Sequence, residues 1–317
     1  MPMIATPGPL PVAPPPLFGE GLQILWEAWD GSVWDIGDAS SGVRLGQGVR
    51  GLNMPPQQRY SDKSPGVDGS RNRGFRVDER PVFWPMRVYT PTQRSQAWLD
   101  YDSAFWNTMH PEYLGTWRVV QPGGRSRTLR VRFESDNDHT FTTDPALLGW
   151  VRYGIDLIAE QPYWLGEPIT RGFAAPADVP FFPEDNGDFV LQISPGSTLA
   201  EFSTDNPGQV PAYPVYNILG PTDSVTINGT EIPFPISAGK AIIIDTDPSQ
   251  QTALDAVVTI GADGKPVYTL TGVERTADLG AVNFAPVQPG MEVSLPIVMN
   301  GAGAVAVDLT PRYFRAW

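Results

Sequence analysis

Proline and glycine interrupt this chain so evenly that no regular element can run far. The 317 residues include 34 prolines and 32 glycines, roughly one residue in five, and no short repeat organises them. Many turns between short strands produce such a pattern, whereas collagen needs a strict repeat and helical bundles need long uninterrupted segments. We therefore predict a mainly β fold.

Composition narrows the class of protein further. The chain is 41% hydrophobic and 18% charged, which is ordinary for a globular protein with buried cores, and its length suits two domains. It has no cysteine, which excludes disulfides, zinc-thiolate sites, iron-sulfur clusters and cysteine nucleophiles. The first residues, MPMIATPGPLPVAPPPL, lack the basic start and unbroken apolar stretch of a secretory signal, and we expect no membrane insertion.

Charge is distributed unevenly along the chain. Residues 1–173 hold 17 basic and 19 acidic side chains, whereas residues 174–317 hold 5 and 16. The two halves therefore present different surfaces. An acidic protein does not bind a phosphate backbone by counterion release, so we expect no nucleic-acid recognition. Such a protein could still line a channel through which DNA slides.

The first half predicts short strands and one helix. Residues 1–17 read as a proline-rich arm, and Leu22–Ile36 as a hairpin around Asp30-Gly31. Residues 37–80, rich in Gly, Arg, Pro and Ser, predict a long loop or irregular arm, a type of segment that is usually functional or interface-forming. Strand character resumes at Val82–Tyr89.

Ser95–His110 is the one convincing helix. Trp98, Tyr101, Phe105 and Met109 recur at helical spacing, Ser95 suits the N-cap, and Pro111 ends the segment. An aromatic stripe of this kind faces a core more often than it binds a ligand.

Two further segments complete the first domain. Residues 115–135 predict a hairpin about Pro122-Gly123-Gly124, with Arg130 and Arg132 on one solvent or partner face. Tyr153–Trp164 alternates as a half-buried strand. Ile169–Gly187 then loses apolar periodicity and is the best linker candidate, so we place the domain boundary near residue 174.

The second half predicts an antiparallel β-sandwich. About eight short strands are separated by turn residues: FVLQIS, YPVYNILG, SVTING, TEIPFPI, KAIIIDT, PVYTLTG, MEVSLPIV and AVAVDLT. Asn228-Gly229-Thr230 fits a glycosylation acceptor, but Asn-Gly between alternating runs is also a strong hairpin signal. Because the signal peptide is missing, we interpret it as the turn of a type I′ hairpin.

Catalytic motifs are missing from the sequence. There is no G-x-S-x-G elbow, P-loop or H-E-x-x-H, and the two histidines, His110 and His139, lie in separate elements. A calcium-binding loop that starts at Asp136 would need glycine at position 141 and glutamate at position 147. The chain has Phe141 and Leu147 there instead. Paired carboxylates for glycoside hydrolysis stay open, because only their spatial separation is diagnostic. We predict no enzyme activity, no cofactor and no metal site.

The order of these elements resembles a known family. The first half looks like the distal tail protein (Dit) family of long-tailed bacteriophages. The likeness rests on the aromatic hairpin, the Gly/Arg/Pro segment, the aromatic helix, the Gln121–Gly124 turn and the stretch Ala159–Trp164. The second half is similar to that family's second domain at four places, which are Tyr213–Gly220, Asn228-Gly229, Ala241–Thr246 and Thr310–Tyr313. The resemblance covers about residues 20–313, and the proline-rich arm departs from it.

The resemblance implies a structural virion protein at the tail tip, made in the host cytoplasm. It implies a tail-tube-like domain at residues 18–173, completed by residues 311–317, and a galectin-like or carbohydrate-module-like sandwich at residues 174–310. It also implies a hexameric ring around the DNA channel, joined to the tail tube protein, a tail-tip hub protein and receptor-binding proteins. The candidate interface residues are Arg44, Arg50, Arg59, Arg71, Arg73, Arg76, Tyr313, Phe314 and Trp317.

A competing interpretation is a carbohydrate-binding module or sugar-active protein. Ten tryptophans and a predicted sandwich suggest it, but Trp317 is the only tryptophan after residue 164. The predicted sandwich therefore lacks the aromatic platform on which sugars stack, and we expect little sugar affinity.

Overall fold

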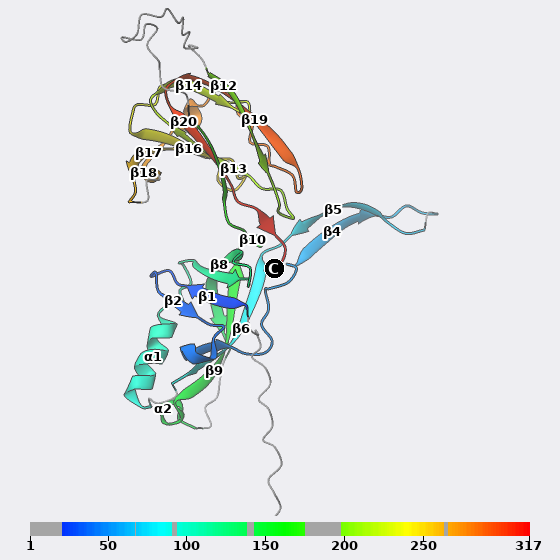
Figure 1. Ribbon diagram of the computed structural model, residues 1–317. Helices are drawn as coiled ribbons and strands as arrows, with labels where there is room; N and C mark the ends of the chain where they lie inside the picture. The colour runs from blue at the N-terminus through cyan, green and yellow to red at the C-terminus, as the bar shows by residue number, and fades with distance from the viewer. Residues whose placement is uncertain (1–20, 67, 91–93, 138–142, 175–197, 263–265) are drawn as a thin grey trace, which may run out of the picture. The chain divides into compact units, whose positions relative to one another are not determined.

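The chain folds into two compact units rich in β-structure (Figure 1). The computed structural model describes residues 21–66, 68–90, 94–137, 143–174, 198–262 and 266–317. One unit comprises Met1–Trp164 with Phe314–Trp317, and the other comprises Leu165–Tyr313. The mainly β prediction is confirmed. The proline-rich arm, His139 and the expected strand FVLQIS lie outside the described residues.

The first unit is built on one antiparallel sheet. Its strands follow the spatial order β2-β1-β7-β8-β9-β6-β3. Their bounds are β1 Gln23–Glu27, β2 Val33–Asp35, β3 Val43–Leu45, β6 Arg80–Tyr89, β7 Gly115–Val120, β8 Ser126–Asp136 and β9 Trp150–Ala159. A backbone hydrogen bond from Leu45 N to Ile36 O, 2.9 Å long, links β3 to the end of β2, so the sheet curls toward its first edge. The chain leaves this unit at β10 (Trp164–Leu165) and returns after β21 (Arg312–Tyr313).

Tryptophans fill the core of the first unit. Trp84 lies edge-on to Trp26 and to Trp117, with ring centroids 5.2 Å apart in both pairs, and Trp117 contacts Trp164 at 5.1 Å. Strand alternation directs these rings to one face of the sheet, because successive side chains in a strand point to opposite sides. Gly115 makes room for them, since a Cβ there would lie 2.0 Å from the Trp26 ring.

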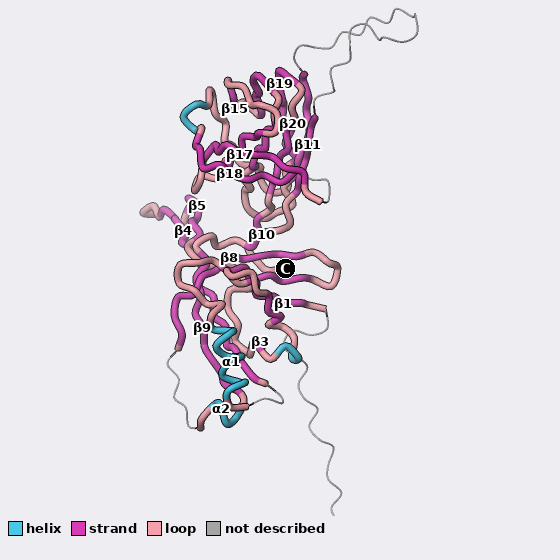
Figure 2. Tube along the Cα trace, turned by 90° about the vertical axis from the view of Figure 1, so that its left-hand side faces the viewer, coloured by secondary structure: helices cyan, strands magenta, loops and turns pink. Residues whose placement is uncertain are grey.

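The predicted helix forms as α1, Gln96–Trp106, beside the short α2, Pro145–Leu148 (cyan in Figure 2). Trp98 and Phe105 are buried, so the expected core-facing stripe is confirmed at those positions. Ser95 occupies the N-cap position as predicted, but its side chain makes no cap hydrogen bond, because its φ of 59° lies outside the extended region that side-chain capping requires.

The expected loop at residues 37–80 contains regular structure. A 3-10 turn, Ala39–Ser41, precedes β3, and β4 (Gln57–Asp62) pairs with β5 (Arg71–Val77) as a separate two-stranded sheet that projects from the unit (Figure 1). We name this sheet the β4–β5 ribbon. Every residue of β4 is exposed, so no alternation of apolar and polar residues marked it as a strand.

The second unit is the predicted sandwich of two antiparallel sheets (strands magenta in Figure 2). One sheet has the order β11-β20-β13-β16-β17-β18 and the other has the order β12-β19-β14-β15. Their bounds are β11 Ile169–Ala174, β12 Thr198–Asp205, β13 Pro214–Leu219, β14 Thr222–Ile227, β15 Thr230–Ile232, β16 Lys240–Asp245, β17 Thr252–Ile260, β18 Pro266–Glu274, β19 Glu292–Gly301 and β20 Ala304–Leu309. A 3-10 turn, Thr276–Asp278, follows β18.

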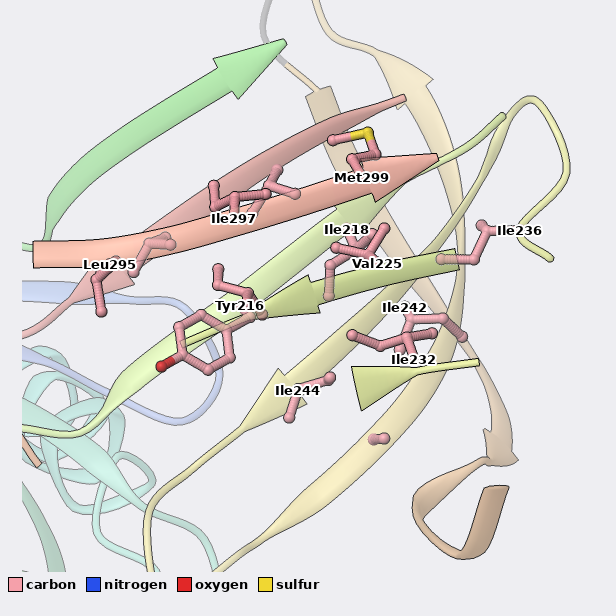
Figure 3. Close-up of a cluster of buried hydrophobic side chains, with 14 residues drawn as sticks. Tyr216, Ile218, Val225, Ile232, Ile236, Ile242, Ile244, Leu295, Ile297 and Met299 are labelled. Atoms are coloured by element: carbon pink, nitrogen blue, oxygen red, sulfur yellow. The ribbon is translucent and has the colours of Figure 1, made fainter. Parts of the chain in front are cut away.

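Aliphatic side chains fill the space between the two sheets (Figure 3). Leu295, Ile297 and Met299 of β19 face Ile218 of β13, and all four are fully buried. Tyr216 is the single aromatic residue among the buried members of this cluster.

The linker prediction fails at its start. Ile169–Ala174 were assigned to a linker, but they form β11, which pairs along its whole length with β20. The contacts therefore divide the chain after Trp164 and not near residue 174. The partner strand lies far away in sequence, so no local pattern reports the pairing.

The Asn-Gly turn forms as predicted. Ile227 pairs with Thr230, which leaves Asn228 and Gly229 as a two-residue loop. Their φ angles are 48° and 80°, and positive φ at both central residues defines the type I′ turn.

Candidate assembly surfaces

The last four residues form part of the first unit. The amide of Ala316 donates to Leu52 O at 2.9 Å, and the Ala316 side chain is fully buried. The Phe314 ring lies 5.8 Å from Tyr163 and 6.5 Å from Phe75 of the β4–β5 ribbon. The C-terminus thus contacts both the sheet of this unit and the base of its projecting ribbon.

Arg80 holds the C-terminal segment Phe314–Trp317 in place. Its guanidinium donates to the carbonyls of Pro162, Gly51 and Phe314 at 2.6, 2.7 and 2.7 Å, and also to the carbonyl of Asn53. Burial lowers the pKa of Arg80 to about 10, so the group keeps its charge at neutral pH. One buried cation therefore ties together three segments of backbone, at residues 51–53, 162 and 314.

Sequence reasoning missed Arg80, although a signal was present. In β6 it occupies the same alternating set of positions as Val82, Trp84 and Met86, all of which are buried. An arginine on the inward positions of a strand needs several hydrogen-bond acceptors, because a buried charge without partners is costly.

Four of the predicted interface arginines lie on the β4–β5 ribbon: Arg59, Arg71, Arg73 and Arg76. Arg73 forms an ion pair with Asp62 at 2.5 Å, and Arg76 lies 3.6 Å from Asp78. All four are exposed, as are Tyr60 and Phe75. The ribbon therefore presents cations and aromatic rings to solvent.

Of the other two predicted arginines, Arg44 lies in β3 of the main sheet and Arg50 forms an isolated bridge with Phe83 of β6. Arg50 covers the Phe83 ring at 5.2 Å. Arg44 of β3 stands directly opposite Arg87 of β6, and Arg87 stands opposite Arg152 of β9. We name these three residues the arginine row. Sequence analysis did not select Arg87 or Arg152, because their alignment depends on strand register.

A cavity of about 470 Å³ lies beside the arginine row. Its lining includes all three arginines, Tyr89 and Tyr153, together with Leu45, Gly46, Gln47, Pro85 and Met86. Burial raises the pKa of the Tyr153 hydroxyl, which donates to Asp102 at 2.8 Å.

The predicted C-terminal aromatic residues do not form one cluster. Tyr313 belongs to β21 in the second unit, whereas Phe314 and Trp317 belong to the first. Trp317 is partly exposed, and the Arg315 guanidinium lies 6.0 Å from its ring.

Among the described residues, no group of three or more His, Asp or Glu side chains is placed to hold a metal ion. Nδ1 of His110 accepts hydrogen bonds from the amides of Glu112 and Tyr113 at 3.0 and 3.2 Å, so this ring shapes a turn. Within the same residues, no helix has the length and apolar character needed to cross a membrane.

Solved phage structures share this architecture over almost the whole chain. The Dit protein of phage SPP1, described as a paradigm of the hub adsorption apparatus in phages that infect Gram-positive bacteria, matches with a TM-score of 0.54 and 11% identity. That match covers 92% of this chain and 98% of the SPP1 protein.

Two structures of the phage P2 baseplate in its activated conformation, one with Ca and one with Sr, each contain a chain that matches at TM-score 0.54 and 12% identity. The matches cover 92% and 91% of this chain, and 98% and 97% of the baseplate chains. Neither a known family model nor a curated protein sequence matches. At these identities the likeness is one of fold, and the chain has the fold of the SPP1 Dit protein.

Proposed function

We propose that the chain is a structural virion protein, a hexameric distal tail adaptor. It joins the tail tube protein to a tail-tip hub protein and receptor-binding proteins, and it is not an enzyme. The observation that carries the proposal is the two-unit fold shared with the SPP1 hub protein over 92% of the chain. Because folds host many functions, the proposal depends also on surfaces suited to assembly.

The β4–β5 ribbon supports assembly into a ring. A two-stranded hairpin is marginally stable in water unless it packs on something else. All six residues of β4 are exposed, and β5 has no fully buried residue. A neighbouring copy that covers the ribbon supplies the missing contacts, and head-to-tail contacts of this kind close into cyclic rings.

The ring we propose encloses a channel through which DNA passes without specific binding. The chain carries a net charge of −13, which repels a phosphate backbone. Assembly in the virion places this channel at the tail tip, after synthesis in the host cytoplasm.

Light scattering after gel filtration, together with negative-stain imaging, tests the ring. We expect particles with six-fold symmetry and six times the mass of one chain. Replacing residues 57–77 by a short Gly-Ser linker should give monomers, because the ribbon contact is lost. The linker should fit without distortion, since Asp78 N already donates to Pro56 O at 3.1 Å.

Paired point variants sharpen this test. Tyr60→Asp places a charge on the ribbon, and Tyr113→Asp makes the same change at an exposed tyrosine on the body of the first unit. We expect rings to dissociate for Tyr60→Asp and to persist for Tyr113→Asp. Rings that survive both Tyr60→Asp and removal of the ribbon would contradict the ribbon contact, and a wild-type monomer that binds polysaccharide would contradict the adaptor.

The carbohydrate-binding alternative gains no support from the second unit. Residues 165–313 contain no tryptophan, and the described aromatic residues of its core cluster lie between the sheets or against them. We therefore expect no retention of the chain on polysaccharide columns.

A further inference from the structure

The arginine row is an unusual arrangement for a sheet surface. Arg44, Arg87 and Arg152 lie directly opposite one another on three adjacent strands. Directly paired residues have Cβ atoms about 5 Å apart, and like charges at this distance destabilise a sheet. The row therefore costs the free protein stability.

The three arginines of the row lack contact ion pairs. Within the part of the chain that the structure describes, none of the three guanidiniums forms an ion pair or a hydrogen bond with an acidic side chain. By contrast, Arg118 and Arg132 on the same sheet each pair with a glutamate, Glu27 and Glu160. The absence of acidic partners is thus a property of the row and not of the whole surface.

Aromatic rings hold two of these arginines in position. Arg87 lies 5.1 Å from the Trp150 ring and 5.2 Å from the Tyr89 ring, and Arg152 lies 5.8 Å from Trp150. Cation-π contacts within about 6 Å are attractive and restrict the guanidinium, but they leave its N–H groups free to donate sideways. The donors are therefore partly ordered before any ligand arrives.

We propose that the arginine row and its cavity form a docking site for an acidic segment of a protein partner. Side-chain carboxylates of that segment accept paired hydrogen bonds from the guanidiniums, a geometry that arginine favours. The rest of the segment lies in the cavity of about 470 Å³ against Tyr89 and Pro85. The site is complete within one copy, so it does not depend on the proposed ring.

Charge and composition favour a protein segment over DNA. Arginine, tryptophan and tyrosine are the residues that most often dominate protein interfaces, and here all three lie together. A duplex presents a long, regular array of phosphates, whereas a loop with two or three carboxylates matches the three clustered arginines of the row.

Fluorescence anisotropy with labelled hexaglutamate tests the site on the full-length protein. The variant Arg87→Gln/Arg152→Gln should weaken binding by about tenfold or more, because each hydrogen bond to a charged group is worth about a factor of ten. The control Arg125→Gln/Arg130→Gln removes the same charge from two exposed positions, one in the turn between β7 and β8 and one in β8, and it should stay close to wild type.

Three results would overturn the proposal. They are no binding of hexaglutamate by the wild type, an equal loss in both double variants, or tighter binding of a short DNA duplex through the same two arginines. The first two leave the ring assay unaffected, so they are distinguishable from failure of the adaptor function.

Thermal unfolding separates a binding role from a structural one. Because the three cations repel one another, Arg87→Gln/Arg152→Gln should leave the melting temperature of the first unit unchanged or raise it. A clear fall would mean that the row holds the sheet together, and it would contradict the docking site.

Discussion

The two units bury cores of opposite chemistry. In the first unit five tryptophans are almost completely buried: Trp26, Trp84, Trp98, Trp117 and Trp164. In the second unit the buried cluster consists of isoleucine, valine, leucine, methionine and alanine around Tyr216. Both units are antiparallel β-structures, so the backbone architecture alone does not dictate which side chains fill them.

The difference shows how each core obtains its order. Edge-to-face aromatic pairs have a defined geometry, and each indole also carries an N–H group that needs an acceptor. Trp26 Nε1 donates to Thr108 Oγ1 at 3.0 Å and Trp164 Nε1 donates to Gly51 O at 3.1 Å. An aliphatic core carries no such polar atoms. The first unit should therefore respond to polar and steric changes, and the second to loss of volume.

Arg80→Met should have the largest effect, and it should be confined to the first unit. The change removes the Arg80 donor from four carbonyls, including that of Phe314, although Gly51 O keeps its hydrogen bond from Trp164 Nε1. We expect a loss of about 3–5 kcal/mol, the usual cost of removing one member of a buried charged network. Differential scanning calorimetry should show one transition shifted and one unchanged.

The control for Arg80→Met is Arg130→Met, at an exposed position of β8. It should leave both transitions close to those of the wild type, because exposed substitutions cost little. A shift of both transitions by Arg80→Met would show that the units unfold together, and it would remove the basis of the comparison.

Ile297→Ala should produce the complementary effect in the second unit. Ile297 is fully buried between the sheets, and truncation of a buried isoleucine costs about 2–5 kcal/mol through lost burial and the cavity left behind. Val298→Ala, the next residue of β19, faces outward and is 37% exposed. The free energies of unfolding of the two variants in urea should differ by more than 1 kcal/mol. Equal losses would mean that Ile297 does not belong to the core of this unit.

Sequence patterns succeeded where one face of a strand is buried. β9 and β20 alternate buried and less buried residues, and both were predicted. β4 is exposed on both faces, so the physical cause of alternation is missing. β17 was missed because a register irregularity between Leu254 and Ala256 interrupts its pattern.

Site residues were harder to predict than strands. Of the arginine row, only Arg44 was selected, because the row exists through pairing between strands that are far apart in sequence. The same limit applies to Arg80, whose acceptors come from three separate segments. Composition identifies arginine-rich segments, but register decides which arginines meet.

Gly115→Ala tests the close packing of the aromatic core. A Cβ at Gly115 would meet the Trp26 ring at 2.0 Å, so the ring must move and disturb its neighbours. Overpacking of this kind costs about 1–3 kcal/mol. Gly123→Ala, in the turn between β7 and β8, has no atom within 4 Å of the added carbon and is the matched control. Equal melting temperatures for the two variants would show that the tryptophan core is loosely packed.

Asn228→Ala should have the smallest effect and should act on the second unit alone. Alanine at φ 48° carries the strain of the left-handed region, about 1 kcal/mol, whereas Asn228→Gly should relieve that strain. Asn228 also donates to the Tyr216 hydroxyl at 3.4 Å, so both variants lose this weak contact and only the backbone term separates them. Chemical denaturation should therefore give Asn228→Gly a higher free energy of unfolding than Asn228→Ala. The reverse order would mean that residue 228 does not need the left-handed conformation, and it would contradict the type I′ turn.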